Sequence, residues 1–248
     1  MRRTLDEALA AVSGVDGWMS PDQGARLYRA AGSTTAGDRI VEIGSFRGRS
    51  TIVLASAAPD GVEVIAIDPH AGNDRGPQEI EGYEAQADDD HRVFLDNLLA
   101  AGVSDRVRHV RAFSQAAHGE VDGSISVLYI DGAHRYGPAR SDIREWGRRV
   151  APGGTLLIHD AFSSVGVTLA ILAELVPGAT FRYVGRSRSL VEYRADLGTS
   201  RADRARNVLR QLAQLLWFAK NLTVKVLLTL RLGPVLRRVV GRVPEWPY

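Results

Sequence analysis

The sequence predicts an α/β fold built on a largely parallel sheet. Apolar strands alternate with helical segments, glycines follow the first strand, and an acidic residue ends the second. The first strand, 39–44, runs into a turn with Gly44 and Gly48, and Asp68 closes the strand at 62–67. Open α/β sheets bind nucleoside-like cofactors here, because small residues allow close approach and a carboxylate accepts hydrogen bonds from ribose hydroxyls.

Two helical segments precede the first strand, at 4–12 and 21–31. The second has Ser20 as a candidate N-cap and Pro21 at its first helical position. After the glycine turn, helical and strand-like segments alternate along the chain. We expect helices at 48–58, 91–101, 138–149 and 165–175, and strands at 107–110, 125–130 and 155–158. This alternation implies a parallel sheet.

The last two strand-like runs, 181–184 and 190–193, have no helix between them. Only the glycine- and serine-containing turn 185–189 separates them, which predicts an antiparallel pair. Earlier in the chain, the stretch 70–90 is polar and acidic and predicts a loop. Its part 73–91 either covers the cofactor cleft as a lid that selects the acceptor or forms a solvated loop.

Length and composition indicate one main globular domain with an appendage. The chain has 248 residues, of which 45% are hydrophobic and 24% charged, as is usual for a soluble protein. It contains no cysteine, which excludes disulfides and thiolate metal sites. The N-terminus lacks the apolar run of a secretory signal, and we expect a cytoplasmic protein.

The net charge of +2 conceals a division between the body and the tail of the chain. Residues 201–248 contain ten basic and two acidic residues, whereas residues 1–200 contain 21 basic and 27 acidic ones. An acidic body is therefore joined to a basic tail. We expect an N-terminal helical segment at 1–35, a cofactor-binding domain at 36–196 and a helical tail at 201–248.

The glycine spacing distinguishes between cofactors. A dinucleotide fingerprint needs G-x-G-x-x-G, but Phe46 stands two positions after Gly44, and the next glycine is Gly48. With Glu42 leading it, the pattern acidic-x-Gly-x-x-x-Gly resembles motif I of the class I S-adenosylmethionine (SAM)-dependent methyltransferases. This resemblance and Asp68, 24 residues after Gly44, imply the cofactor-binding residues Glu42, Gly44, Ser45, Gly48, Ser50, Asp68, Ser114 and Asp131.

A second motif follows the strand at 125–130 and begins with Asp131 and His134 in the order D-G-A-H-R-Y. Asp160 follows His159 at the end of the strand 155–158. Because adjacent parallel strands end at the same edge of a sheet, Asp131 and Asp160 can reach one cation. Hard oxygen ligands of this kind suit Mg²⁺.

The pattern D-G-x-H-x-Y with a later H-D resembles the divalent-metal-assisted small-molecule O-methyltransferases, which include enzymes that methylate sugars on antibiotics and glycans. The resemblance covers 40–193. It implies a Rossmann-like seven-stranded sheet with an antiparallel last strand and helices on both faces. It also implies that Asp131 and Asp160 hold the metal and that His134 is the base for the acceptor hydroxyl. Many relatives place another Asp or Asn where this chain has Ala161, which removes one ligand.

Simpler interpretations remain open for these residues. Asp131 can position SAM or cap a helix, Asp160 can end a strand, and His134 can be a solvated loop histidine. Position relative to Asp131 and a near-neutral pKa favour a catalytic role for His134. The remaining histidines have no comparable partners in the sequence, and we assign no role to His70, His91, His109 or His118.

The tail has helical periodicity from 203 to 231. Its wide apolar face contains Leu209, Leu212, Leu215, Leu216, Leu222, Val226, Leu227 and Leu230, and its polar stripe contains Arg206, Arg210, Gln214, Asn221 and Lys225. Basic and polar residues within the apolar run argue against a membrane-spanning helix. The segment 203–242 either lies on anionic lipid or packs on the body or a second copy, and no nucleic-acid partner is expected.

These features together predict a SAM-dependent O-methyltransferase that acts on a hydroxyl of a sugar, glycan or related small molecule, assisted by Mg²⁺. The tail adds the prediction of peripheral contact with the inner face of a membrane. An NAD-dependent oxidoreductase shares the sheet and the ribose carboxylate, but Phe46 disfavours it. A non-catalytic SAM-binding interaction module is the other alternative.

Overall fold

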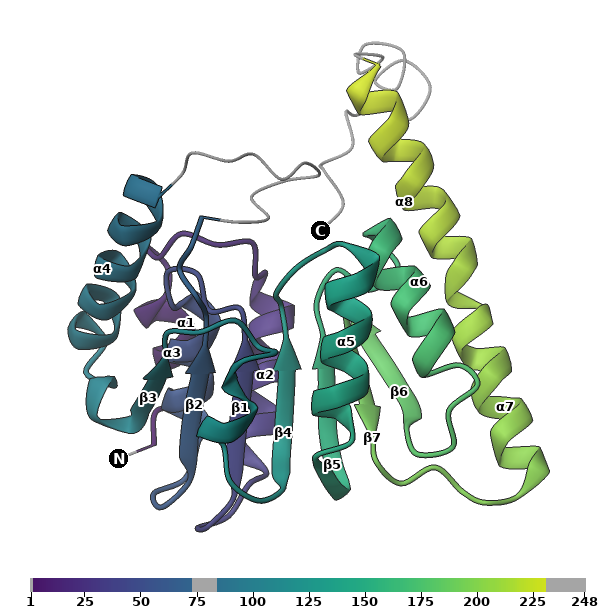
Figure 1. Ribbon diagram of the computed structural model, residues 1–248, viewed down its shortest axis with the longest axis horizontal. Helices are drawn as coiled ribbons and strands as arrows, with labels where there is room; N and C mark the ends of the chain where they lie inside the picture. Colours follow the sequence, from purple (N-terminus) through teal and green to yellow (C-terminus); the bar gives the residue numbers. More distant parts are fainter. Residues whose placement is uncertain (1, 73–83, 231–248) are drawn as a thin grey trace.

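The computed structural model describes residues 2–72 and 84–230. Its centre is one seven-stranded sheet with the order β3-β2-β1-β4-β5-β7-β6 (Figure 1). The strands are β1 Arg39–Ile43, β2 Glu63–Ile67, β3 Val107–Val110, β4 Ile125–Ile130, β5 Val150–Ile158, β6 Arg182–Ser187 and β7 Leu190–Arg194. β1 to β5 run parallel, and β7 pairs antiparallel with both β5 and β6. The expected Rossmann-like sheet with its antiparallel last strand is confirmed.

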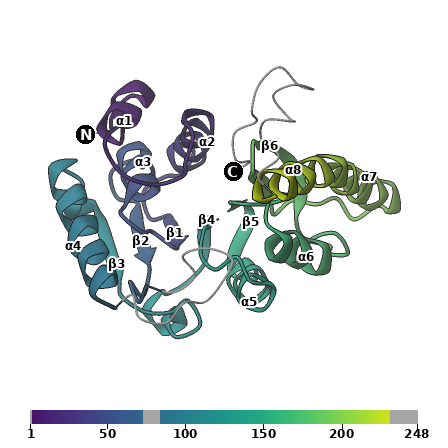
Figure 2. The same ribbon diagram turned by 90° about the horizontal axis from the view of Figure 1, so that it is seen from above.

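Helices cover both faces of this sheet (Figure 2). The α-helices are α1 Leu5–Ala11, α2 Pro21–Gly32, α3 Arg49–Ala57, α4 Glu84–Ala100, α5 Tyr136–Gly147, α6 Val165–Glu174, α7 Arg201–Leu212 and α8 Gln214–Thr229. The first three lie on one face, α5 and α6 lie on the other, and α7 and α8 lie beside β6. Ser20 forms a capping box with Gln23, and Pro21 begins α2 as predicted.

Each face of the sheet has its own apolar core. Leu54, Phe94 and Tyr129 are fully buried on the face of α1 to α4, and Trp146 is fully buried on the face of α5 and α6. Because both faces are covered, the central strands are mostly apolar on both faces rather than alternating. This arrangement explains the largely apolar runs at β2 and β4 and the burial of Glu42 within β1.

One predicted loop is partly wrong. Residues 84–90 belong to α4, which begins about two turns before the predicted helix at 91–101. The three consecutive aspartates that suggested a loop therefore lie in a helix, where Asp90 is buried and pairs with Arg47 at 2.9 Å. The other part of the suggested lid, 73–83, lies outside the described residues.

The tail forms two helices rather than one, because α7 ends at Leu212 and α8 begins at Gln214. Some of its polar residues face the body, contrary to the usual pattern of an amphipathic helix, whereas Arg206 and Arg210 of the predicted polar stripe stay exposed. Asn221 is buried and donates to the carbonyl of Phe162 at 3.2 Å, and Lys225 donates to Ser163 at 3.0 Å. The described helices include none that is long and apolar enough to span a bilayer.

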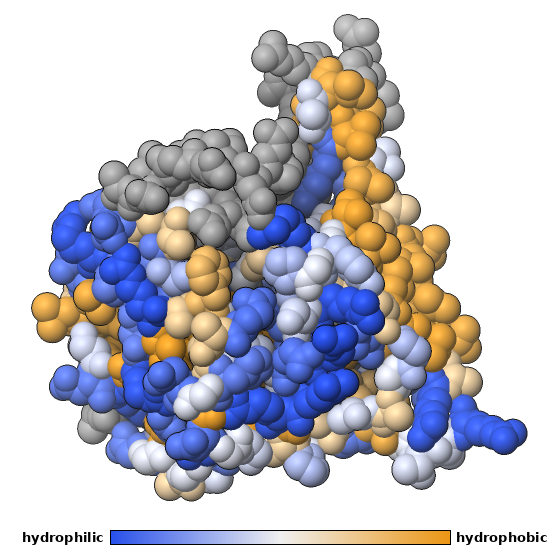
Figure 3. Space-filling view, viewed as in Figure 1, coloured by the Kyte–Doolittle hydropathy of each residue, from blue (hydrophilic) through white to orange (hydrophobic). Residues whose placement is uncertain are grey.

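The opposite side of the tail exposes a continuous apolar band, which Figure 3 shows along α7 and α8. Its exposed members are Leu209, Leu212, Leu216, Leu222, Val226 and Leu230. Leu215, Trp217 and Phe218 instead pack partly against the core. The predicted apolar face is therefore divided between the body and the surface.

Asn207 of α7 connects the tail to the edge strand β6. The backbone N–H of Tyr183 donates to its Oδ1 at 2.8 Å, and its Nδ2 donates to the carbonyl of Phe181 at 3.0 Å. The side chain thereby satisfies strand groups that an edge would leave unpaired. It is buried, so water cannot replace it.

Asn207→Ala is expected to lower the free energy of unfolding by roughly 2–4 kcal/mol, because it leaves a buried donor and a buried acceptor unpaired. Urea denaturation followed by tryptophan fluorescence measures this loss. The matched control is Arg206→Ala, which changes the neighbouring exposed residue. Its free energy of unfolding should stay within about 0.5 kcal/mol of the wild-type value. Equal stability of the two variants would contradict the role of Asn207.

Candidate active site

The sheet topology determines where a ligand site can form. The strand order changes direction between β1 and β4, which are neighbours in the sheet although β2 and β3 follow β1 in the chain. Doubly wound sheets bind ligands at such a switch point, outside the carboxyl ends of the strands. The glycine turn after β1 and the acidic motifs after β4 and β5 both lie at this edge.

The glycine turn lies directly against the end of β4. Gly44 has φ +85°, and a methyl group at this position would collide with the backbone carbonyl of Asp131. Gly48, with φ +87°, is the N-cap of α3. Only glycine adopts these conformations without strain, and only a residue without a side chain permits the first contact. The hydroxyl of Ser45 in this turn is buried and has no hydrogen-bond partner within residues 2–72 and 84–230.

Asp68 holds the turn from the neighbouring strand. Its Oδ2 accepts hydrogen bonds from the backbone N–H groups of Ser45 at 2.8 Å and Phe46 at 2.9 Å. Its Oδ1 accepts from the N–H of His70 at 2.8 Å. The carboxylate thus connects the ends of β1 and β2, and Oδ1 keeps a second lone pair for another donor. Its expected contact with a ribose stays a prediction.

Glu42 lies beneath the turn and is completely buried. Its carboxyl accepts hydrogen bonds from the hydroxyls of Ser50 and Thr51, both at 2.5 Å. Burial raises the pKa of Glu42 to about 8, although these two hydrogen bonds act to lower it. The structure therefore pairs Glu42 and Ser50 with each other and shows them shaping the turn. Contact of either side chain with the cofactor stays a prediction.

Ser114, expected beside the adenine, is likewise engaged within the protein. Its hydroxyl donates to Asp142 of α5 at 2.5 Å, and both side chains are buried. Burial raises the pKa of Asp142 to about 6, while the hydrogen bond from Ser114 acts to lower it. The pair joins the segment after β3 to α5, and a direct role of Ser114 toward the cofactor stays a prediction.

The structure brings the second set of predicted residues together. Asp131 after β4 and Asp160 after β5 lie with His134 so that one ligand atom of each is within 4.8 Å of the others. His134 Nε2 is 2.9 Å from Asp160 Oδ2. The predicted proximity of these three residues is therefore correct.

Two neighbours that the sequence analysis did not select complete this group. His159 is buried, and its Nδ1 lies 3.1 Å from Asp131 Oδ1 and 3.5 Å from Asp160 Oδ2. Tyr129 donates its hydroxyl to Asp131 Oδ2 at 2.7 Å. His159 precedes Asp160, and Tyr129 lies two residues before Asp131. Strand alternation places Tyr129 and Asp131 on the same side of β4, but no short-range pattern indicates that His159 contacts Asp131.

The aspartates control the charge of both histidines. Burial acts to lower the pKa of His159, but the charges of Asp131 and Asp160 raise it well above its ordinary value. Burial likewise acts to lower the pKa of His134, but the hydrogen bond to Asp160 and the charges of Asp160 and Asp131 together raise it. Burial acts to raise the pKa of Asp160, yet His159 and His134 hold it well below its usual range. The site is a compact network of imidazoles and carboxylates.

Three histidines without an assigned role also meet in the structure. His70 follows β2, His91 lies in α4 and His109 lies in β3, and one ring nitrogen of each is within 4.8 Å of the others. Burial lowers the pKa of His109 to about 4, with further contributions from His70 and His91. The expectation that these residues lack partners is wrong. His118 lies apart and stacks on Trp146.

Comparison with known proteins agrees with this fold. Residues 41–161 match the family model of a methyltransferase domain. An uncharacterized protein, y4gI, of Sinorhizobium fredii is 29% identical over 125 residues, which are 49% of this chain and 13% of that protein. The chain thus spans a small part of this curated relative.

Solved structures share the fold at low sequence identity. The O-methyltransferase NovP has a TM-score of 0.57 and 16% identity, over 71% of this chain and 81% of that one. The O-methyltransferase TomG from Streptomyces achromogenes, in complex with SAM, has a TM-score of 0.50 and 20% identity, over 77% and 86%. The match shows a methyltransferase domain over 41–161, and the solved structures share its fold, which agrees with the predicted SAM-dependent methyltransferase.

The pKa of Glu42 predicts a pH-dependent stability. Its folded value of about 8 exceeds the ordinary 4.5, so the folded protein keeps a proton that the unfolded chain releases between these pH values. Wild-type stability should therefore fall as the pH rises through this window. Glu42→Gln removes the dependence, and its stability relative to the wild type should increase by roughly 2–4 kcal/mol between about pH 5 and 8.

Urea denaturation at a series of pH values measures this difference. The control Glu120→Gln alters an exposed glutamate and should follow the wild-type curve. If Glu42→Gln also follows the wild-type curve, Glu42 is ionised in the folded protein and its proposed neutral state is wrong.

Proposed function

We propose that this protein transfers the methyl group of SAM to a hydroxyl oxygen of a sugar, glycan or related small molecule. The observation that carries the proposal is the position of His134, which pairs with Asp160 at the switch point of the sheet while 43% of its side chain stays exposed. A base at this edge can reach both the solvent and the glycine turn. NovP and TomG, which share the fold, are O-methyltransferases.

The residues of the turn fit SAM. Gly44 lets the turn lie directly against the end of β4, and Ser45 has a buried hydroxyl with no hydrogen-bond partner among the described residues. The first N–H groups of α3 suit a carboxylate, because a helix N-terminus favours an anion. SAM, when bound, supplies an electrophilic methyl group. The role of the turn is to hold the cofactor at the ends of β1 and β2, beside Asp131.

His134 is proposed to remove the proton from the acceptor hydroxyl. Its Nε2 faces Asp160, which would stabilise the imidazolium that forms. His159 is buried and pairs with Asp131. Its role would be to hold Asp131 in place, and it would not contact the acceptor. The protein also contributes alignment, since methyl transfer needs the acceptor oxygen in line with the bond that breaks.

A divalent cation such as Mg²⁺ fits the same group. Asp131 and Asp160 would hold it through carboxylate oxygens, with His134 within reach. Bound there, it would lower the pKa of the acceptor hydroxyl. Ala161 is buried and offers no ligand, so His159 or water would replace the acid that many relatives have. Because the histidines already pair with both aspartates, a cation would compete with protons for this site.

Replacing His134 tests the proposed base. His134→Gln is expected to lower methyl transfer by about 10²–10⁴-fold while SAM affinity stays nearly unchanged, because general-base catalysis contributes this much to a rate. Small-molecule extracts incubated with isotopically labelled SAM and analysed by mass spectrometry report turnover and acceptor class. Calorimetry reports SAM binding, and NAD is titrated as the comparison ligand.

The control His118→Gln changes a histidine that stacks on Trp146 away from the site, and it should retain turnover. Unchanged turnover in His134→Gln would remove the proposed base. SAM binding without methylation of any acceptor pool would favour the non-catalytic alternative. Loss of turnover with a chelator and its recovery with Mg²⁺ would support the metal.

We also propose that the outward face of the tail rests on the cytoplasmic surface of an anionic membrane. The apolar band on α7 and α8 is exposed, and basic residues flank it. Leucines beside arginines are the composition of interfacial helices. The polar residues that would otherwise face water contact the body instead, through Asn221 and Lys225. The apolar side of the tail is therefore exposed and available for contact with a membrane.

Substituting Ser for Leu209, Leu216 and Leu230 together should abolish most flotation with anionic liposomes, because it removes the apolar area that would enter the interface. The control Leu99→Ser alters an equally exposed leucine of α4. Equal flotation of both variants would reject the lipid contact. A wild type that dimerises in solution without floating would identify a second copy as the occupant.

A further inference from the structure

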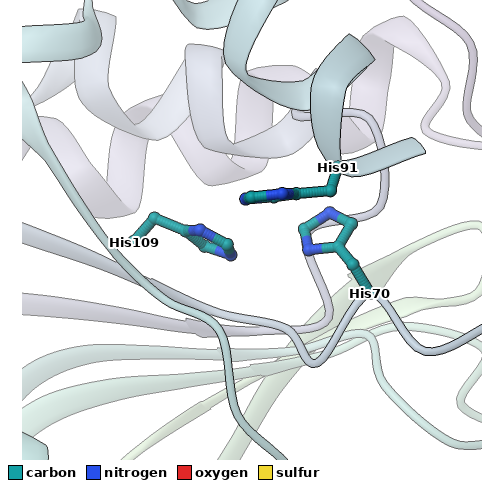
Figure 4. Close-up of side chains that lie close together, drawn as sticks. All are labelled: His70, His91 and His109. Carbon is teal, nitrogen blue, oxygen red and sulfur yellow. The ribbon is translucent and has the colours of Figure 1, made fainter. Parts of the chain in front are cut away.

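Three histidines from three separate elements converge beside β3, on the side of the sheet that α4 covers. Figure 4 shows the rings of His70, His91 and His109 turned toward one another. The ring centroids are 5.0 Å apart for His70 and His91 and 5.1 Å apart for the other two pairs. One nitrogen of each ring lies within 4.8 Å of the others. No sequence motif links these residues, since 39 positions separate the first from the last.

We propose that this histidine cluster is a binding site for one transition-metal cation of the Zn²⁺ type, held by three imidazole nitrogens. Neutral imidazole is a preferred ligand of zinc, copper and nickel, whereas Mg²⁺ prefers oxygen. Three protein ligands leave a fourth position for water. The site is separate from Asp131, His134 and Asp160, which follow β4 and β5.

The hydrogen bond of His70 prepares its ring for a metal. Its Nε2 lies 2.8 Å from the carbonyl of Phe46, and a carbonyl can only accept, so Nε2 carries the proton. The lone pair of the neutral ring is therefore on Nδ1. This nitrogen is buried and has no hydrogen-bond partner among the described residues. A backbone carbonyl that fixes the tautomer in this way is the usual support of a metal-binding histidine.

His109 offers a second unpartnered nitrogen. Its Nε2 is buried without a hydrogen-bond partner in the described part of the chain, and the residue hydrogen-bonds to the backbone of Asp68. Its ring packs on Phe94 with centroids 4.8 Å apart. Nδ1 of His70 and Nε2 of His109 are thus both buried without hydrogen-bond partners among the described residues, and they belong to one cluster. An unsatisfied buried polar atom costs free energy, and a bound cation would satisfy both.

His91 closes the cluster from α4. Its Nδ1 lies 3.4 Å from a guanidinium nitrogen of Arg111, which also pairs with Asp88 at 2.5 Å. Arginine can only donate, so Nδ1 of His91 accepts. Metal binding through Nδ1 therefore displaces the Arg111 contact, and binding through Nε2 moves its proton to Nδ1 and ends the same contact. Asp68 adds favourable negative charge, with Oδ1 3.7 Å from Nδ1 of His70.

A cation here would connect α4 and β3 to the segment after β2 that contains Asp68 and His70. The N–H of His70 donates to Asp68, and Asp68 accepts from the N–H groups of Ser45 and Phe46. The cluster thus lies directly behind the glycine turn. The bound metal would stabilise the glycine turn through His70 and Asp68. Metal binding at this cluster does not depend on methyl transfer.

Metal titration of the full-length protein tests the site. Metal-free protein carrying Asp131→Asn and Asp160→Asn is titrated with Zn²⁺ by calorimetry and with Co²⁺ by visible absorption, so that the acidic group cannot contribute. We expect one ion per chain, ligand-field bands of nitrogen-bound Co²⁺, and a higher Tm with Zn²⁺. His109→Ala and His91→Ala, each in this background, should weaken binding by at least about 100-fold.

The matched control His118→Ala removes a histidine outside the cluster and should bind like its parent. His91 lies on a helix and is only partly buried, so His91→Ala should fold even if His109→Ala does not, which circular dichroism verifies. No stoichiometric Zn²⁺ binding by the parent would overturn the proposal. So would undiminished binding by a folded His91→Ala variant. Either result would leave methyl transfer by the wild type unaffected.

Discussion

The close approach of the β1 turn to the end of β4 is the constraint on which the rest of the site depends. Gly44 allows this approach, because any side chain would collide with the backbone of Asp131. This contact places the glycine turn, where the cofactor is predicted to bind, next to Asp131. Asp68 holds the same turn from β2 through two backbone N–H groups. Two neighbouring strands thus determine one rigid edge.

The buried polar groups around this edge differ in what they do. Glu42 is neutralised by burial and supports the turn, whereas Asp160 stays ionised because two imidazoles face it. Burial alone would neutralise both carboxyls, and only the presence of a cationic partner separates them. Asp160 can therefore keep the charge that a cation or an imidazolium needs. Burial thus has opposite outcomes for the two carboxyls, because Asp160 has imidazole partners and Glu42 has hydroxyl partners.

The tail shows how tertiary contacts can reverse an amphipathic pattern. Asn207 satisfies the edge strand β6, and Asn221 and Lys225 donate to carbonyls near α6. These bonds hold Asn207, Asn221 and Lys225 against the body, while Leu209, Leu216 and Leu230 on the other side stay exposed. The periodicity of the sequence locates the two faces but contains no information on which one the body takes. Unpaired backbone groups at the edge of the sheet decide it.

The sequence by itself determined the α/β fold, the order of its strands and helices, the glycine turn and the acidic residues at the strand ends. These features are local, since strand periodicity and glycine spacing act over a few residues. Only the tertiary structure decided the partners of each side chain, such as Glu42 with Ser50, His159 with Asp131, and the three clustered histidines. Such contacts join distant segments through strand order and helix packing, for which no short-range pattern exists in the chain.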